Sequence, residues 1–296
     1  MHCTERTPPD RVFRQKPACQ NDAMQALEHW PINRRRRITG VFTDIDDTLT
    51  TEGAITPDAL AALAALKAAG LDVIAITGRP VGWSEPFARV WPVNAIVAEN
   101  GAVALLSSQT RRQPLTDGHG QLSKLYQQDE ATRQTHYARM QQVAARVVRD
   151  VPGAVISQDS RGRETDMAID HSEFTHLPPA AIARAVQIMQ DEGMNATVSS
   201  IHINGWFGHH NKLQGARWIV QELLGRDLEA EMDRWVYVGD STNDQLMFEA
   251  FGNSVGVANV RRFEAQLSHL PRYITQGERG AGFAEVAAAV LAARAD

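Results

Sequence analysis

Cysteine, aromatic residues and long apolar runs are all scarce in this chain. Of its 296 residues only two are cysteine, Cys3 and Cys19, and both lie in the opening segment. This usage disfavours a disulfide-stapled secreted fold. The opening segment has no apolar stretch long enough for a signal peptide, and no later stretch approaches the roughly 20 apolar residues that span a bilayer. We expect a cytoplasmic protein with no membrane partner.

A strong charge of either sign is also missing. The formal net charge of -5 gives no overall attraction to nucleic acid. The basic run at residues 34–37 favours a solvated linker over a nucleic-acid or phosphate contact. An apolar content of 43% is ordinary for a globular protein, and the length suggests about two domains. We expect a monomer or homodimer.

Turn residues and apolar periodicity divide the chain into three predicted parts. Residues 1–37 are rich in proline, arginine and polar groups, which predicts a flexible tail. Residues 38–101 and 211–296 alternate apolar strands with helices, as in a Rossmann-like doubly wound parallel sheet. Residues 102–210 break this rhythm and predict an inserted α+β domain. The predicted fold class is therefore α/β, with an α+β insert.

Three predicted strands of the core end in polar groups. A strand ending at Thr43 precedes Asp44 and Asp46, another precedes Thr77, and a third is followed by Asp240, Asn243 and Asp244. Turn chemistry or helix capping explains any one of these groups. Because parallel strands end along one edge of a sheet, all three groups can converge in one site.

Several carboxylates in one cleft repel one another, and they take up protons unless a cation compensates. The ligands offered here are oxygen atoms, without histidine or cysteine in the clusters. Such a donor set favours Mg²⁺.

These motifs resemble those of a known family. They are Asp44-x-Asp46-x-Thr48, Thr77-Gly78-Arg79, Lys212 and Gly239-Asp240-x-x-Asn243-Asp244. In order and spacing they resemble the four motifs of the haloacid dehalogenase superfamily of phosphotransferases. The resemblance covers about residues 38–290. The insert lies between the second and third motifs, as does the cap of subfamily IIB, which includes sugar-phosphate phosphatases, sucrose-phosphate phosphatase and phosphomannomutase. One departure is Asn211-Lys212-Leu213, where the family often has Asp/Ser-Lys-Gly.

The resemblance implies a Mg²⁺-dependent phosphatase that acts on a small phosphorylated metabolite, with a sugar phosphate as the expected class. Asp44 would attack phosphorus and form an aspartyl-phosphate. Asp46 would protonate the leaving group and then activate water. Thr77, Gly78 and Lys212 would hold the phosphoryl group.

The resemblance also implies the metal ligands. Mg²⁺ would be held by Asp44, the backbone carbonyl of Asp46, and Asp240, while Asn243 and Asp244 would complete the ligand set or support it. From the insert, Asn204 is a candidate substrate contact.

Two alternatives remain for the function. A phosphomutase of the phosphomannomutase type would pass the same phosphoryl group to a second sugar hydroxyl. A catalytically inactive module would bind a phosphorylated ligand or a protein partner without turnover.

Two patterns in the insert have open interpretations. In the predicted strand 164–170, Glu164, Asp166 and Asp170 share one face, which favours a solvated surface over one that lines the site. The histidines at 202, 209 and 210 favour surface or hinge positions over a transition-metal site.

Overall fold

A computed structural model describes residues 23–106 and 122–295. Its main feature is a nine-stranded sheet, with strand order β1-β15-β14-β13-β2-β5-β6-β7-β8. All neighbouring pairs from β1 to β6 are parallel, and β7 and β8 extend the sheet antiparallel. The strands are β1 (Gln25–Ala26), β2 (Gly40–Thr43), β5 (Asp72–Ile76), β6 (Ala95–Ala98), β7 (Val103–Leu106), β8 (Ser123–Tyr126), β13 (Trp235–Gly239), β14 (Ser254–Gly256) and β15 (Tyr273–Ile274).

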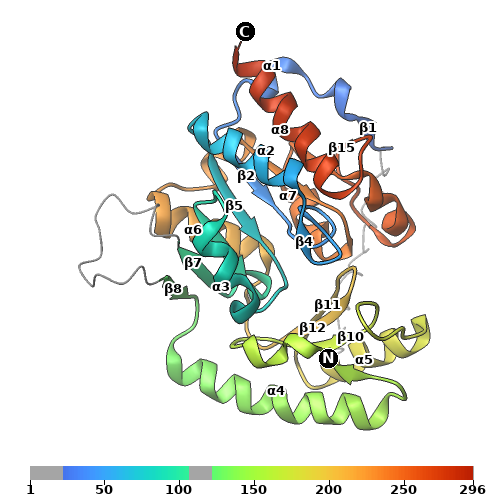
Figure 1. Cartoon of the computed structure of the whole chain (residues 1–296). Coiled ribbons are helices and arrows are strands. Elements are labelled where there is room, and N and C mark those ends of the chain that lie inside the picture. Colours follow the sequence, from blue (N-terminus) through green and yellow to red (C-terminus); the bar gives the residue numbers. More distant parts are fainter. Residues whose placement is uncertain (1–22, 107–121, 296) are drawn as a thin grey trace, which may run out of the picture.

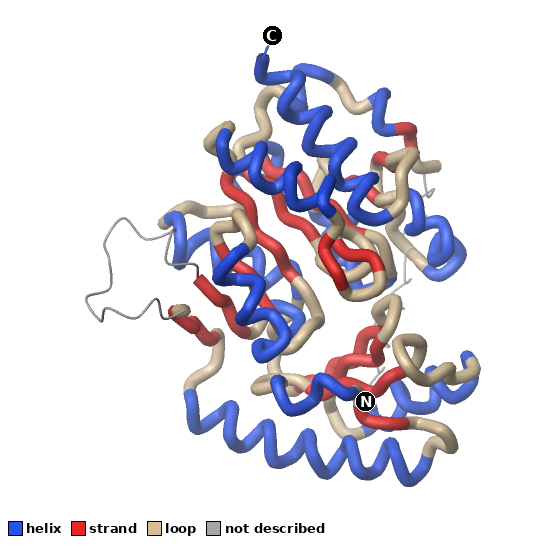
Figure 2. Tube along the Cα trace, in the orientation of Figure 1, coloured by secondary structure: helices blue, strands red, loops and turns tan. Residues whose placement is uncertain are grey.

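Helices cover both faces of this sheet (Figure 2). On one face lie α2 (Pro57–Ala68), α3 (Val81–Val90) and α8 (Arg279–Ala295), and on the other lie α6 (Lys212–Leu224) and α7 (Gln245–Ala250). The α2 helix starts with proline at its first position and Asp58 in its first turn, both of which favour a helix N-terminus. The prediction of an α/β fold with a doubly wound sheet is confirmed.

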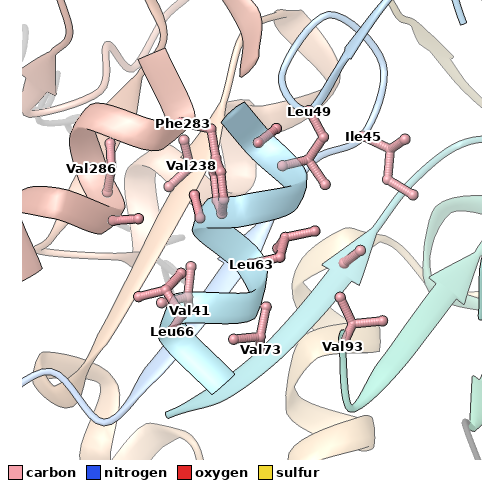
Figure 3. Close-up of a cluster of buried hydrophobic side chains, with 14 of the residues drawn as sticks. Val41, Ile45, Leu49, Leu63, Leu66, Val73, Val93, Val238, Phe283 and Val286 are labelled. Carbon is pink, nitrogen blue, oxygen red and sulfur yellow. The ribbon is translucent and has the colours of Figure 1, made fainter. Parts of the chain in front are cut away.

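The central strands have apolar side chains on both faces because both faces are covered. Val41 and Val73 belong to the cluster under α2 and α8, while Phe42 and Ile74 belong to the cluster under α6 and α7. Figure 3 shows the first cluster, in which Phe283 of α8 lies close to α2. Two cores thus fix the position of β2, which leads directly into Asp44.

The insert forms a second, smaller sheet with its own core. Its strand order is β11-β12-β10-β9, and all of its pairs are antiparallel. In Figure 1 this sheet lies towards the large sheet, and its two long helices lie on the side away from it. The elements are α4 (Glu130–Asp150), β9 (Val155–Ile156), β10 (Met167–Asp170), α5 (Pro179–Asp191), β11 (Asn195–Val198) and β12 (His202–Trp206). We call residues 127–210 the cap.

The predicted start of the insert at residue 102 is wrong, because two more strands of the large sheet, β7 and β8, follow it. β7 pairs with β6 and β8 pairs with β7, so residues 103–106 and 123–126 belong to the large sheet. The chain reverses at Glu99–Gly101, where Glu99, Asn100 and Gly101 all have positive φ. After this tight reversal the apolar strand β7 pairs with β6, so the sheet continues past the second motif.

The predicted flexible tail is wrong for residues 23–37. β1 pairs with β15, and Trp30 is fully buried. The Trp30 indole stacks on Tyr273 at 5.8 Å between centroids, and its N–H donates to Asn253 Oδ1 at 3.2 Å. The short helix α1 (Ile32–Arg35) follows and leads to β2. The buried Trp30 side chain holds this segment against the sheet. Because the rest of the segment is mostly polar, its composition predicted a flexible tail instead. Residues 1–22 lie outside the described chain.

Within residues 23–106 and 122–295, every helix is too short or too polar to span a bilayer.

Candidate active site

The polar groups that follow three strands lie together at one edge of the large sheet. β13, β2 and β5 are parallel neighbours, so their carboxyl ends reach the same edge. Asp44 follows β2, Thr77 follows β5, and Asp240 follows β13. Lys212, the first residue of α6, joins them because its ammonium group contacts Asp44. The structure thus brings together groups that lie far apart in the sequence.

Asp44 and Lys212 form a buried ion pair. Lys212 Nζ donates to Asp44 Oδ1 at 2.6 Å and to Asp244 Oδ1 at 2.7 Å. Burial, together with the carboxylates of Asp244 and Asp46, raises the pKa of Asp44 to about 8, although Lys212 opposes the rise. Burial lowers the pKa of Lys212, but Asp244 and Asp44 outweigh it and raise that pKa above its ordinary value. Asp44 therefore needs further positive charge nearby to be fully ionised at neutral pH.

Asp240 offers an oxygen that can accept such a cation. Its Oδ1 is buried and has no hydrogen-bond partner within the described residues, while its Oδ2 accepts from Asn259 Nδ2 at 3.0 Å. Burial and the charges of Asp44 and Asp244 raise the pKa of Asp240 well above its usual range. Oxygens of Asp44, Asp240 and Asp244 lie within 4.8 Å of one another. This donor set fits Mg²⁺, which prefers carboxylate oxygens.

Asp244 and Asn243 hold the loop after β13. Asp244 Oδ2 accepts from the backbone N–H groups of Asp240 and Ser241, at 2.9 and 3.1 Å. Its Oδ1 accepts from Lys212 and from the Tyr237 hydroxyl. Asn243 Oδ1 accepts from Ser241 Oγ at 2.9 Å. Both oxygens of Asp244 are thus engaged, which suits a role in orienting Lys212 and Asp240.

Asp46 lies beside Asp44 in the turn after β2. Asp47 has a φ of 54°, which reverses the chain there before the small hairpin of β3 (Thr50–Thr51) and β4 (Ala54–Ile55). Arg79 Nε donates to both oxygens of Asp46, at 2.9 and 3.0 Å. Burial raises the pKa of Asp46, although the Arg79 guanidinium opposes the rise. Arg79 therefore fixes the orientation of this carboxyl group.

Thr77 and Gly78 follow β5 at the same edge of the sheet, and Gly78 lines the space beside Asp44 and Asp46. The Thr77 side-chain oxygen accepts from the Arg79 backbone N–H at 3.0 Å, so its hydroxyl proton can be donated elsewhere. A Cβ on Gly78 would come within 3.3 Å of the side-chain oxygens of Asn100 and Asn204. Asn204 Nδ2 lies 3.3 Å from the Gly78 carbonyl oxygen. The cap thus contacts the core at the second motif through a close approach that favours glycine.

Sequence reasoning missed the residues that join the cap to the core. Glu99 is fully buried, and it accepts from the backbone N–H groups of Val81 at 3.0 Å and Thr165 at 2.5 Å. Arg163 donates to the Gly78 carbonyl at 3.1 Å and to Asp166 at 2.7 Å. The positive φ of Glu99 is a backbone feature without a sequence signal, because such residues are usually asparagine or glycine.

The prediction of a solvated face for the acidic strand is wrong for two of its members. Asp166 is 1% exposed and accepts from Asn100 Nδ2 at 3.3 Å and Asn204 Nδ2 at 3.1 Å. Asp170 is also 1% exposed, and its oxygens accept backbone N–H groups of residues 172–175. The alternation of charged and apolar residues predicted that the charged face would be exposed. Asp166 and Asp170 are buried instead, because a carboxylate can be buried once its oxygens are hydrogen-bonded.

The histidines of the cap do not assemble a metal site within residues 23–106 and 122–295, where the cluster with suitable spacing is Asp44, Asp240 and Asp244. His202 is buried and its Nε2 lies 2.8 Å from Glu173 Oε2. His210 is buried against Trp206, with ring centroids 5.6 Å apart.

Two adjoining spaces lie beside these groups. One of about 10 Å³ lies between core and cap and is lined by Asp44, Asp46, Gly78, Arg79, Ser199, Ser200, Ile201, His202, Asn204, Ser241 and Asn243. The other, of about 350 Å³, is lined by Asp46, Asp47, Thr50, Glu52, Gly53, Arg79, Ser172, Glu173, Phe174, Ile201 and Arg279. Asp46 borders both spaces, whereas Asp44 borders only the smaller one.

Comparisons with known proteins agree with this fold. Residues 41–127 match the family model for haloacid dehalogenase-like hydrolases. A phosphoglycolate phosphatase of Methanothermobacter thermautotrophicus is 22% identical over 83% of this chain and 95% of its own. The crystal structure of a Thermoplasma acidophilum protein aligns with a TM-score of 0.61 and 14% identity, covering 86% of this chain and 98% of that one. The Synechocystis sucrose-phosphatase, solved with sucrose and phosphate, aligns with a TM-score of 0.59, 14% identity and the same coverages.

Proposed function

Since the chain belongs to the haloacid dehalogenase-like hydrolases and is a phosphoric monoester hydrolase, we propose that it is a Mg²⁺-dependent enzyme that hydrolyses a small sugar phosphate through an aspartyl-phosphate. The observation that carries this proposal is the arrangement of two carboxyl groups. Asp44 is paired with Lys212, whereas Asp46, two residues later, is held by Arg79 and borders the larger cleft. Two neighbouring carboxyl groups with different partners suit two different chemical roles.

In the first step, an oxygen of Asp44 forms a bond to phosphorus while the bond from phosphorus to the leaving oxygen breaks. The electron pair of the broken bond goes to the leaving oxygen, which takes a proton from Asp46. The Lys212 ammonium group and the Thr77 hydroxyl offset the charge that develops on the phosphoryl oxygens. In the second step, the oxygen of a water forms a bond to phosphorus while Asp46 accepts one of the water's protons, and the bond from phosphorus to the Asp44 oxygen breaks. This releases inorganic phosphate and returns Asp44 as a carboxylate.

The metal site would be held by Asp44, Asp240 and the Asp46 carbonyl, with Asn243 and Asp244 supporting it. When bound, Mg²⁺ supplies positive charge that keeps Asp44 ionised and compensates the phosphate. The unpartnered Asp240 oxygen and the raised pKa of Asp44 both support this assignment.

The larger cleft supports a sugar as the leaving group. Its side chains include the carboxylates of Asp46, Asp47, Glu52 and Glu173, against the guanidinium groups of Arg79 and Arg279. An excess of carboxylates can accept hydrogen bonds from sugar hydroxyls, and it disfavours a second anionic group. Phosphoglycolate, which carries such a group, is the second candidate because a relative is named for it. A comparison of kcat/KM for a hexose phosphate and phosphoglycolate separates the two.

A phosphate-release screen over phosphorylated metabolites, with and without Mg²⁺, tests the proposal. We expect Mg²⁺-dependent release of inorganic phosphate, and a loss of at least ~10³-fold in Asp44→Asn, because a missing nucleophile cannot be replaced. Unchanged hydrolysis by that variant would overturn the mechanism. Isomerised sugar phosphate without phosphate release would indicate the mutase instead, and ligand binding without any turnover would indicate an inactive module.

A further inference from the structure

Arg79 connects Asp46 to the cap through one more carboxylate. We propose that Glu173, on the loop that follows β10, is a positioning residue: through Arg79 it orients the Asp46 carboxyl, so that proton donation to the leaving group is aligned only while the cap is docked. This inference rests on the proposed function, because it assigns Glu173 a part in the step that Asp46 performs.

The contacts run in one unbroken series from cap to core. His202 Nε2 lies 2.8 Å from Glu173 Oε2, and Arg79 Nη2 donates to Glu173 Oε1 at 2.9 Å. Arg79 Nε then donates to both oxygens of Asp46. The Arg79 guanidinium also lies over the Trp83 ring, 4.9 Å from its centroid. Arg79 is 5% exposed, so water does not easily replace these partners.

Hydrogen bonds to Asp170 hold the loop that carries Glu173 in place on the cap. The Asp170 carboxylate accepts four successive backbone N–H groups, those of residues 172–175, at 2.9 to 3.1 Å. Asp170 itself lies on β10, within the cap sheet. The position of Glu173 is therefore set by the cap as a body, and movement of the cap would carry Glu173 away from Arg79.

A planar guanidinium with charged partners at two of its nitrogens has its plane fixed, whereas one partner leaves it free to turn. Asp159 of the cap adds a weaker contact, at 3.5 Å from Arg79 Nη1, but it is mainly held by Arg163. Glu173 is thus the cap carboxylate that can fix Arg79. Without Glu173, Arg79 would still contact Asp46 but would no longer hold the Asp46 carboxyl group in one orientation.

Two aryl esters of similar shape test this role. p-Nitrophenolate leaves as a stable anion without help, whereas phenolate, whose conjugate acid has a pKa of about 10 like that of tyrosine, benefits from a proton donor. We compare kcat/KM, which covers only the steps up to departure of the leaving group, because the later attack of water is common to both esters. We expect Glu173→Gln to lower kcat/KM for phenyl phosphate by ~10- to 100-fold, as misalignment of an acid does, and to change kcat/KM for p-nitrophenyl phosphate by less than ~3-fold. Glu173→Asp, which keeps the charge, should recover part of the phenyl phosphate rate.

Glu164→Gln is the matched control. Glu164 also joins cap to core through an ion pair, with Lys124 Nζ at 2.9 Å, and its side chain is 33% exposed, compared with 21% for Glu173. It does not contact Arg79. This variant should leave the ratio of the two kcat/KM values at the wild-type value, which would show that loss of a cap contact alone is not responsible.

The outcomes separate this inference from the proposed function. An equal loss of kcat/KM for both esters, or no loss for phenyl phosphate, would overturn the role of Glu173 while leaving the phosphatase intact. If the Glu164 control shifts the ratio as much as Glu173→Gln, general cap loosening is the cause and the inference fails. A wild-type protein that hydrolyses neither ester with Mg²⁺ would refute the proposed function and this inference together.

Discussion

Replacing Asp240 by asparagine should stabilise the metal-free protein while it removes the response to Mg²⁺. Asp240 is 1% exposed, and its carboxylate lies within 4.8 Å of oxygens of Asp44 and Asp244. Two unit charges at that distance repel by about 3.5 kcal/mol at an effective dielectric constant of about 20. Because burial raises the pKa of Asp44 to about 8 and the pKa of Asp240 well above its usual range, both groups are only partly ionised near pH 8. We therefore expect up to about 2 kcal/mol of relief at pH 8, or up to roughly 4 to 8 °C in Tm.

The sign of the pH dependence follows from the raised pKa values. A carboxyl group whose pKa is higher in the folded state than in the unfolded state stabilises the fold at low pH, and this contribution is lost as pH rises through the folded pKa. The metal-free wild type should therefore lose stability between pH 6 and pH 8. The advantage of Asp240→Asn should be smaller at pH 6, where the carboxyl groups are protonated.

Thermal unfolding at both pH values, in EDTA and with increasing Mg²⁺, checks this prediction. The wild type should gain stability with Mg²⁺, since a ligand that binds only the folded state raises Tm, and the variant should gain little. Asp191→Asn removes the same charge from an exposed helix end and serves as the control. A lower Tm for Asp240→Asn in EDTA, or an undiminished response to Mg²⁺, would refute the view of Asp240 as a metal ligand in a repulsive cluster.

Two further substitutions test the fold around the site. Trp30→Ala should lower the free energy of unfolding by about 3 to 5 kcal/mol, because it empties a fully buried position. Urea denaturation measures this loss, and Ile32→Ala, at an exposed position, is the control. A loss below ~1 kcal/mol for Trp30→Ala would show that residues 23–37 are dispensable for stability. Gly82→Ala places a Cβ 2.7 Å from the Gly162 Cα of the cap, so it should displace the cap. We expect KM to rise several-fold, about the effect of a few lost contacts, while Tm is not lowered. Gly252→Ala, where a Cβ meets nothing within 4 Å, should leave KM unchanged, and a similar KM for both variants would show that the close approach of Gly82 to Gly162 does not position the cap.

Local patterns in the amino-acid sequence predicted the core and the side chains that are proposed to carry the chemistry. Apolar strands that alternate with helices can bury both faces only as a parallel sheet, and such a sheet aligns the residues after its strands. This is why the order of strands and helices alone assigns Asp44, Thr77 and Asp240 to one edge. The resemblance to haloacid dehalogenase-like hydrolases, which the comparisons confirm, rests on these same local patterns.

The contacts between cap and core could be seen only in the folded structure. Trp30, Glu99, Asp166 and Glu173 are single residues whose burial depends on partners far away in the chain. Periodicity reports which face of an element is apolar, but it does not report that a carboxylate will be buried against an arginine or a backbone N–H group. The acidic face of the 164–170 segment therefore looked solvated in the sequence, although Asp166 and Asp170 are buried. Long-range hydrogen bonds, which no local pattern encodes, set the orientation of Asp46 and the shape of the cleft beside it.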